Sequence, residues 1–302
     1  MPTALKYNLK YQFNLISLLD EILNLGSLKI KIYVLKLLVL LLALCCFIAV
    51  WCYGAQPVNK SQMDSCNTAS MINPMADSML KLSGELLYKV KIKADSKAVE
   101  KALSGLTYNQ LFKGLKNDAA KKTFWVNMYN AWYQILAIRL NKTRPKIFTE
   151  QLIPVAGLSL SLDDIEHGIL RKYRWKWSMG YLPQFLPQKT IKELAVDSID
   201  YRIHFALNCG AKSCPPIAFY RYDKIDQQLD MATVSFMKGE SVIDDDKKIL
   251  TVSKILSWFK RDFGGSNGIR ALMTKVFKRD FTGYSIQFND YNWDKDLGNF
   301  DE

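Results

Sequence analysis

The apolar positions in the first half of the chain recur with the spacing of helices. Apolar residues three and four positions apart run through residues 79–88 and 96–106, and then through a longer segment, 118–140. Asp118 can cap the N-terminus of the third segment, because its carboxylate can accept hydrogen bonds from free backbone N–H groups. The predicted inner face of this helix consists of Phe124, Met128, Ala131, Ile135 and Leu136. The pattern therefore predicts three helices before residue 141.

Strand-like and helical segments follow in the second half. Residues 158–162 alternate as a strand, and a helix over 163–171 follows, opened by a capping pattern of Asp163 and Glu166. The remaining predicted elements are a helix at 223–237, a hairpin at 242–252, helices at 253–259 and 268–277, and a strand at 284–288. Helices grouped first, with strands from distant segments, indicate an α+β fold. We predict a helix-rich N-terminal half and a small, mainly antiparallel sheet in a single domain, residues 75–302.

Residues 201–216 carry the densest chemistry of the chain. Residues 201–207 alternate as a strand with their large apolar side chains on one face, so His204 would point away from the core. A turn with Cys209 and Cys214 follows, and His204 is one of only two histidines in the sequence. An imidazole and two thiols where a strand meets a loop can serve nucleophilic catalysis, metal binding or a disulfide.

Five segments share motifs with one family. They are 124–131 (FWVNMYNA), 162–171 (LDDIEHGILR), 204–216 (HFALNCGAKSCPP), 253–263 (SKILSWFKRDF) and 291–293 (YNW). In this order they resemble the motifs of a bacterial and plant family catalogued as domain of unknown function 547, and the resemblance covers roughly residues 78–300. It implies a bacterial, exported member of that family. Plant relatives can lack both cysteines, which counts against a thiol chemistry that every member requires.

An unbroken apolar run, 37–51, follows several lysines near the N-terminus. It falls short of the roughly 20 residues needed to span a bilayer and matches the hydrophobic region of a signal peptide. Small residues at Cys52 and Gly54 would fit cleavage after Gly54, whereas the long preceding segment favours an uncleaved signal anchor. We predict that residues 1–56 are a signal peptide or signal anchor and that residues 57–74 are a linker. The rest would be exported, and either periplasmic or anchored in the inner membrane facing the periplasm.

The chain is basic, with a formal charge of +12 from 41 Lys and Arg against 29 Asp and Glu. The basic residues are scattered and no recognised nucleic-acid motif accompanies them, so we expect a solvated basic surface and no nucleic-acid partner. Such a surface can attract an anionic lipid or polymer. The sequence has no glycine-rich phosphate loop, no serine-nucleophile elbow and no HExxH motif. Nothing in it therefore supports nucleotide-binding, serine-hydrolase or zinc-protease function.

The cysteine count leaves two pairings open. Cleavage after Gly54 would leave Cys66, Cys209 and Cys214, which allow at most one internal bridge and leave one free thiol. A bridge between Cys209 and Cys214 would remove the nucleophile unless it is redox-active. A bridge between Cys66 and Cys209 would instead leave Cys214 free.

Cys214 is the predicted nucleophile, because an imidazole or nearby backbone amides can lower the pKa of a loop thiol. His204 would take and return the proton, and His167 is the other candidate base. Asn127 or Asn130, neighbours on the predicted helix, would supply an amide for an oxyanion. The expected function is therefore cysteine-dependent acyl transfer. The enzyme would be an amide or ester hydrolase or transferase of the cell envelope, acting on a small molecule, a peptide or an envelope polymer.

Four residues are predicted to bind substrate: Asn130, Glu166, Arg202 and Cys209. We predict that the four catalytic residues, Cys214, His204, His167 and Asn127, converge in one cleft with Asn130 and Glu166 nearby. Glu166 is also expected to complete the helix cap. No cofactor is expected. One alternative is a non-catalytic envelope binding module in which the two neighbouring cysteines form a disulfide. Another is a zinc site with four candidate ligands: His167, His204, Cys209 and Cys214.

Overall fold

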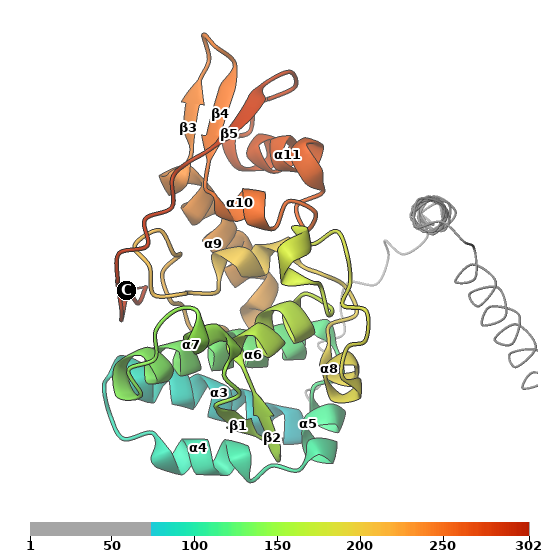
Figure 1. The fold of residues 1–302 in the computed structure, drawn as a ribbon, viewed down its shortest axis with the longest axis vertical. Coiled ribbons are helices and arrows are strands. Elements are labelled where there is room, and N and C mark those ends of the chain that lie inside the picture. The colour runs from blue at the N-terminus through green and yellow to red at the C-terminus, as the bar shows by residue number, and fades with distance from the viewer. Residues whose placement is uncertain (1–73, 302) are drawn as a thin grey trace, which may run out of the picture. The chain divides into compact units, whose positions relative to one another are not determined.

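A buried helix, α6 (Asp118–Gln134), lies near the middle of the computed structural model, which describes residues 74–301 (Figure 1). The predicted extent of this segment is confirmed, and its last turn, Ile135–Arg139, is widened into a π-helix. Consecutive side chains from Ala120 to Gln134 are buried, so the helix is enclosed on every side rather than only along the predicted face.

Asn117, not Asp118, caps this helix. The Asn117 side-chain oxygen accepts a hydrogen bond from the backbone N–H of Ala120 at 2.9 Å. The Asp118 carboxylate instead accepts backbone hydrogen bonds from Asp197 at 2.7 Å and Ser198 at 3.0 Å. The start of α6 therefore also holds a loop that lies 80 residues further along the chain.

The first core is built around α6. The surrounding helices are α3 (Pro74–Lys91), α4 (Lys97–Ser104), α5 (Tyr108–Gly114), α7 (Lys146–Thr149) and α8 (Lys189–Leu194). The helices predicted at 79–88 and 96–106 are confirmed, whereas α5, which begins with a capping box of Thr107 and Gln110, was not predicted. A short antiparallel hairpin, β1 (Ile153–Val155) and β2 (Leu158–Leu160), completes this part.

The second core is formed by the C-terminal elements, in orange and red in Figure 1. Its helices are α9 (Ile225–Glu240), α10 (Ile255–Trp258) and α11 (Gly265–Phe277). Its sheet has the order β3 (Val242–Asp244), β4 (Ile249–Val252) and β5 (Ser285–Phe288). The predicted hairpin is antiparallel, and β5 adds to it in parallel with Leu250 opposite Ile286. The α+β class is confirmed, with two small sheets in residues 74–301 instead of one.

The strand predicted through His204 is wrong, because Tyr201–Phe205 forms a 3₁₀-helix, η4. The Asp200 side chain caps it by accepting a backbone hydrogen bond from its first turn. The segment places Ile203 in the core around α6 and Phe205 in the core of α9 to α11. His204 is itself buried, with 3% of its surface exposed. The apolar alternation therefore reflects burial in two cores, one on each side of the segment, and not a strand.

The helix predicted over 163–171 is a π-helix, η2 (Asp164–Leu170). Its wide turns include a hydrogen bond from the Arg171 N–H to the Glu166 carbonyl, five residues back, at 2.9 Å. The cap also lies earlier than predicted. The backbone N–H of Ser161 donates to the Asp164 carboxylate at 2.9 Å, and the backbone N–H of Asp164 donates to the Ser161 hydroxyl at 3.0 Å. Glu166 is thereby free for another role.

The predicted signal segment and the linker, up to residue 73, lie outside the described residues. All described residues fall within one compact unit, residues 71–302. No helix in residues 74–301 combines the length and apolar character needed to cross a bilayer.

Candidate functional site

A pocket with a cavity of about 450 Å³ is lined by residues of both cores. Its aromatic lining consists of Tyr129, Phe148, Trp177, Trp258, Phe259, Tyr291 and Trp293. Its acidic, basic and cysteine side chains come from Asp163, Glu166, His167, Lys176, His204, Cys209 and Cys214. Small-molecule sites typically combine such an apolar lining with a few convergent polar groups.

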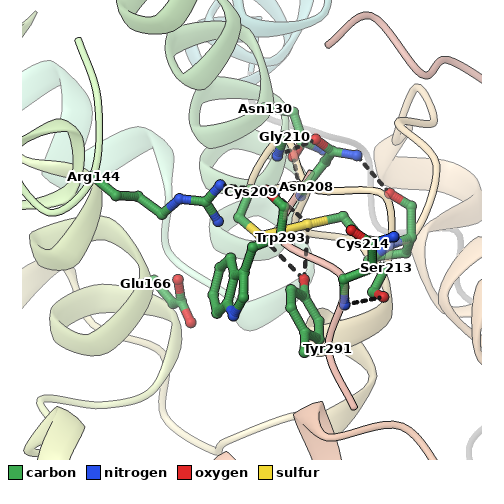
Figure 2. Close-up of a disulfide and its surroundings, with 12 residues drawn as sticks. Asn130, Arg144, Glu166, Asn208, Cys209, Gly210, Ser213, Cys214, Tyr291 and Trp293 are labelled. Atoms are coloured by element: carbon green, nitrogen blue, oxygen red, sulfur yellow. Dashed lines mark hydrogen bonds between the residues drawn. A yellow bond between two sulfur atoms is a disulfide. The ribbon is translucent and has the colours of Figure 1, made fainter. Parts of the chain in front are cut away.

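Cys209 and Cys214 form a disulfide in the lining of this pocket (Figure 2). The Cys214 sulfur accepts a hydrogen bond from the backbone N–H of Cys209 at 3.0 Å. The Tyr291 hydroxyl lies 3.2 Å from the Cys209 sulfur and 3.1 Å from the Cys214 sulfur. Because neither sulfur carries a hydrogen in the disulfide, the tyrosine is the donor in both contacts. In this state Cys214 has no free thiol.

Two buried asparagines hold the loop that carries the disulfide. The Asn130 amide donates to the Ala206 carbonyl at 2.9 Å, and its oxygen accepts from the backbone N–H of Asn208 at 2.9 Å. The Asn208 amide in turn donates to the Pro215 carbonyl at 2.7 Å, and its oxygen accepts from the Gly210 N–H at 2.8 Å. Asn130 therefore positions the loop from behind and does not line the pocket.

Asn127 also serves the backbone rather than the pocket. Its amide donates to the Tyr220 carbonyl at 2.9 Å, and its oxygen accepts from the Tyr220 N–H at 3.1 Å. Both ends of the side chain are thus occupied, and Asn127 is not among the residues that line the pocket. The prediction that it joins the cleft and binds an oxyanion does not fit this arrangement.

A C-terminal segment completes the lining on the side of the disulfide. The backbone N–H of Ser213 donates to the Asn292 carbonyl at 3.3 Å, and the Asn292 N–H donates back to the Ser213 hydroxyl at 2.9 Å. Further on, the Lys212 N–H donates to the Asp294 carbonyl at 2.9 Å. These contacts place Tyr291 beside the sulfurs.

The two histidines are joined through a buried ion pair. Nδ1 of His167 lies 2.6 Å from the Arg171 guanidinium, which donates to it, and Nε of Arg171 donates to Asp262 at 2.6 Å. The same carboxylate oxygen of Asp262 lies 2.9 Å from Nε2 of His204. The side chains of Arg171 and Asp262 are fully buried, with 0% exposed. The ring of His204 also stacks on Phe259, with ring centroids 3.9 Å apart.

The charges of this cluster follow from its contacts. Burial opposes ionisation of Asp262, but hydrogen bonds from His204 and Arg171 outweigh it and lower its pKa to about 2. Burial and the charge of Arg171 lower the pKa of His167 well below its usual value. Burial also lowers the pKa of His204, opposed by Asp262. The cluster therefore holds one cation, one anion and two neutral imidazoles at neutral pH, and Nε2 of His204 is engaged with Asp262 rather than with Cys214.

Glu166 is the pocket carboxyl with the most unusual acidity. Burial raises its pKa to about 7, and the positive charge of Arg171 only partly opposes this. Its carboxylate accepts a hydrogen bond from the Tyr129 hydroxyl at 3.1 Å. Near neutral pH the group can therefore donate or accept a proton. The prediction that Glu166 completes a helix cap is wrong, because Ser161 and Asp164 form that cap.

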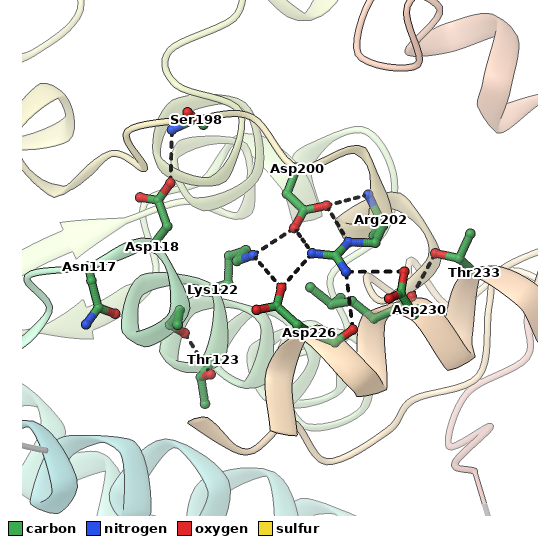
Figure 3. A network of polar contacts seen from close by, with 12 residues as sticks. Asn117, Asp118, Lys122, Thr123, Ser198, Asp200, Arg202, Asp226, Asp230 and Thr233 are labelled. Carbon is green, nitrogen blue, oxygen red and sulfur yellow. Dashed lines mark hydrogen bonds and ion pairs between the residues drawn. The ribbon is translucent and has the colours of Figure 1, made fainter. Parts of the chain in front are cut away.

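Arg202 lies in a different polar cluster (Figure 3). Its guanidinium pairs with Asp200 at 2.7 Å and Asp226 at 2.6 Å, and Lys122 pairs with the same Asp200 carboxylate at 2.7 Å. Arg202 also contacts Asp230 at 3.3 Å, which ties η4 to α9. It does not line the pocket, so its predicted role in binding substrate there does not fit the structure.

The zinc alternative has no support in residues 74–301, where no group of three or more His, Cys, Asp or Glu side chains is arranged to hold a metal ion. The predicted cleft is present in part, because five of the predicted site residues line the pocket: Glu166, His167, His204, Cys209 and Cys214. Asn127, Asn130 and Arg202 lie outside its lining.

The sequence interpretation missed three residues that organise the site: Arg171, Asp262 and Tyr291. All three belong to segments already singled out by motif, yet none was assigned a role in the site. A signal existed for Arg171, which follows His167 by four residues and so can meet it on one helical face. No local spacing connects Asp262 or Tyr291 with the cysteine loop.

A family model described as "Protein of unknown function, DUF547" matches residues 112–237. The chain resembles this family over that segment. The matched part of this DUF547-like chain includes α6, η2 and the disulfide loop, whereas Asp262 and Tyr291 lie beyond it. Neither the curated proteins nor the solved structures include one that matches the chain.

Proposed function

We propose that this domain is a small-molecule binding module that works with the Cys209–Cys214 disulfide in the lining of its pocket. The observation that carries the proposal is the cavity of about 450 Å³, in which aromatic side chains surround Glu166 and His167. This volume lies within the roughly 300–1,000 Å³ that small-molecule sites occupy. A carboxyl group with a pKa near neutrality in such a cavity is also typical of functional sites.

The lining indicates the chemistry of the ligand. Trp258, Tyr291 and Trp293 form a cluster with ring centroids 4.4–5.4 Å apart, which offers apolar faces to a flat ring or an aliphatic group. His167 accepts at Nδ1 from Arg171 and therefore carries its proton on Nε2, where it is a donor. Glu166 can accept or donate. We therefore propose a largely apolar ligand with a polar group able to accept a hydrogen bond.

Cysteine-dependent acyl transfer is the second candidate, because Cys214, His204 and His167 line the same pocket. It would need the disulfide to be reduced. It would also need Nδ1 of His204 as the base, since Nε2 is hydrogen-bonded to Asp262. Without an oxyanion role for Asn127, the backbone N–H groups of the loop would have to stabilise the intermediate.

Export from the cytoplasm is also part of the proposal. Disulfides persist in oxidising compartments such as the bacterial periplasm, and the Cys209–Cys214 bridge supports such a location. Fractionation of cells that produce the chain tests this directly. Cleavage near residue 54 would lower the mass of the product, and retention would place the full-length chain in the membrane fraction.

Tryptophan indole signals in nitrogen-15 NMR spectra test ligand binding. Trp177, Trp258 and Trp293 line the pocket, whereas Trp125 and Trp132 are buried in the first core. We expect neutral aromatic fragments that carry a hydrogen-bond acceptor, beginning with quinoline, to shift the three pocket signals and to leave the two core signals in place. Assignment uses single Trp→Phe variants.

A matched pair of variants controls this experiment. Trp177 lies in the short 3₁₀-helix Lys176–Ser178, and Trp175 directly precedes this helix. The two side chains are 76% and 49% exposed, but Trp175 does not line the pocket. Trp177→Ala should weaken fragment binding and Trp175→Ala should not. The binding proposal fails if no fragment shifts a pocket indole at millimolar concentration, or if both variants weaken binding equally.

A further inference from the structure

The disulfide is reachable from the pocket. Both Cys209 and Cys214 line it, and Cys209 is only partly buried, whereas Cys214 is 6% exposed. A thiol small enough to enter the cavity can therefore approach the Cys209 sulfur in particular. Attack on a disulfide requires such access to one of its sulfurs.

The loop depends little on the bridge for its shape. The two cysteines are only five residues apart, and a disulfide gives the least entropic stabilisation when it closes a short loop. The amides of Asn130 and Asn208 hold the same loop through four hydrogen bonds that do not involve sulfur. The loop can therefore keep its place when the bridge is open.

The two sulfurs have different surroundings. Within the described residues, the Cys214 sulfur accepts from the Cys209 N–H at 3.0 Å and lies 3.1 Å from the Tyr291 hydroxyl. The Cys209 sulfur lies 3.2 Å from that same hydroxyl. Donors aimed at a sulfur stabilise its thiolate, and a stabilised thiolate leaves faster in exchange. Cys214 is thus arranged as the leaving group and Cys209 as the sulfur that is attacked.

We propose that Cys209 and Cys214 are a redox-active pair that exchanges with a low-molecular-weight thiol in the pocket. The thiolate attacks the Cys209 sulfur, the bond between the two cysteine sulfurs breaks, and its electron pair leaves on Cys214. Cys214 takes up the proton given by the thiol. A second thiol then attacks the thiol-derived sulfur of the mixed disulfide and releases Cys209 as a thiol. Two thiols are oxidised to one disulfide, and the cystine is reduced to two cysteines.

This activity goes beyond ligand binding, and the two proposals can fail separately. Fragment binding is measured through tryptophan signals in the oxidised protein, whereas exchange is measured through the mass of the chain. A protein that binds fragments but does not exchange thiols would retain the first proposal and lose the second.

The first test compares reduction of the folded and unfolded chain. The purified full-length protein is treated with dithiothreitol, quenched with an alkylating reagent, and its free thiols are located by peptide mass. We expect the folded protein to lose the Cys209–Cys214 bridge within about tenfold of the rate seen in concentrated guanidinium chloride. Reduction about a thousandfold slower in the folded state would overturn the proposal. This test needs no variant.

The second test uses Tyr291→Phe, which removes the hydroxyl near both sulfurs and keeps the ring. We expect slower reduction by about tenfold and a higher pKa of the Cys214 thiol in the reduced protein, because a donor to the thiolate is lost. Tyr284→Phe is the control, since the Tyr284 hydroxyl bonds Asp245 and lies outside the pocket. Unchanged exchange in Tyr291→Phe, or an equal effect in Tyr284→Phe, contradicts the role of the hydroxyl.

The third test assigns the attacked sulfur. Cys214→Ser leaves Cys209 free and should form a mixed disulfide with oxidised glutathione. Cys209→Ser should react more slowly when both rates are expressed per thiolate, because its remaining thiol is the more buried one. Both variants are checked for the thermal unfolding transition of the wild type. Faster reaction of Cys209→Ser would overturn the proposed order of attack.

Discussion

Replacing Glu166 with glutamine should make the protein more stable at alkaline pH and leave it unchanged in acid. The folded-state pKa of Glu166 is about 7, against 4.5 for the ordinary carboxyl group, so the folded protein holds this proton more tightly than the unfolded chain. At 1.36 kcal/mol for each pKa unit, this difference corresponds to about 3 kcal/mol, reduced to about 2 kcal/mol by solvent that reaches the pocket.

The direction of this pH dependence follows from proton binding. Well below pH 4.5 the carboxyl is protonated in both the folded and the unfolded state, so it does not lower the free energy of unfolding. As pH rises through 4.5 to about 7, only the unfolded chain releases the proton freely, so wild-type stability falls across this window. Glutamine has no proton to lose and its oxygen can still accept from the Tyr129 hydroxyl. The free energy of unfolding of the variant should therefore equal that of the wild type near pH 4 and exceed it by about 2 kcal/mol at pH 8.

Urea unfolding at a series of pH values measures this difference. Glu85→Gln is a matched control, because Glu85 is an exposed carboxylate on α3. We expect the difference in free energy of unfolding between Glu85→Gln and the wild type to be the same at pH 4 and at pH 8. A Glu166→Gln variant that is destabilised at pH 8, or a difference that does not change with pH, would refute the reasoning that burial raises this pKa.

Three further substitutions probe the support of the site, each by chemical unfolding monitored by circular dichroism. Asp262→Asn should cost about 3–5 kcal/mol because the fully buried Arg171 loses its anionic partner, and a loss below 1 kcal/mol would contradict the ion pair. Asn127→Ala should cost about 1–3 kcal/mol because the backbone groups of Tyr220 lose their partner, and it should leave fragment binding intact. Gly210→Ala should cost about 1–3 kcal/mol, because φ is +66° there and the new Cβ would lie 2.4 Å from the Tyr133 ring. An unchanged denaturant midpoint would show that the loop adjusts without strain and would contradict this prediction.

Local pattern was sufficient for most of the fold. Amphipathic periodicity placed α3, α4, α9 and α11 and the β3–β4 hairpin, because each buries one face against one core. It failed at residues 201–207, where side chains enter two different cores and the resulting alternation imitates a strand. It also could not distinguish a π-helix from an α-helix at η2, since the two share composition and differ only in hydrogen bonding.

The site was predictable where its residues lie in one segment and not where contacts are distant. The cysteine loop and His204 stand together in the sequence, and both line the pocket. Asp262 lies 58 residues from His204, and nothing in the local spacing connects them. Asn127 shows the opposite error. An asparagine on a helix that faces a loop has the chemistry of an oxyanion donor, so its type and position suggested a catalytic role. In the structure its amide and its oxygen are instead both hydrogen-bonded to the backbone of Tyr220, whose buried polar groups need these partners.

The C-terminal position of Tyr291 sets an order of events during synthesis of the chain. Tyr291 lies 77 residues after Cys214, so at about 5–20 residues per second a ribosome needs roughly 4–15 s to make it after the second cysteine. During that interval the sulfurs lack their hydroxyl neighbour and the pocket lacks one of its sides. The nascent cysteines are therefore open to an oxidant or reductant from the side that Tyr291 later covers, whereas a reagent reaches them through the pocket once the chain has folded.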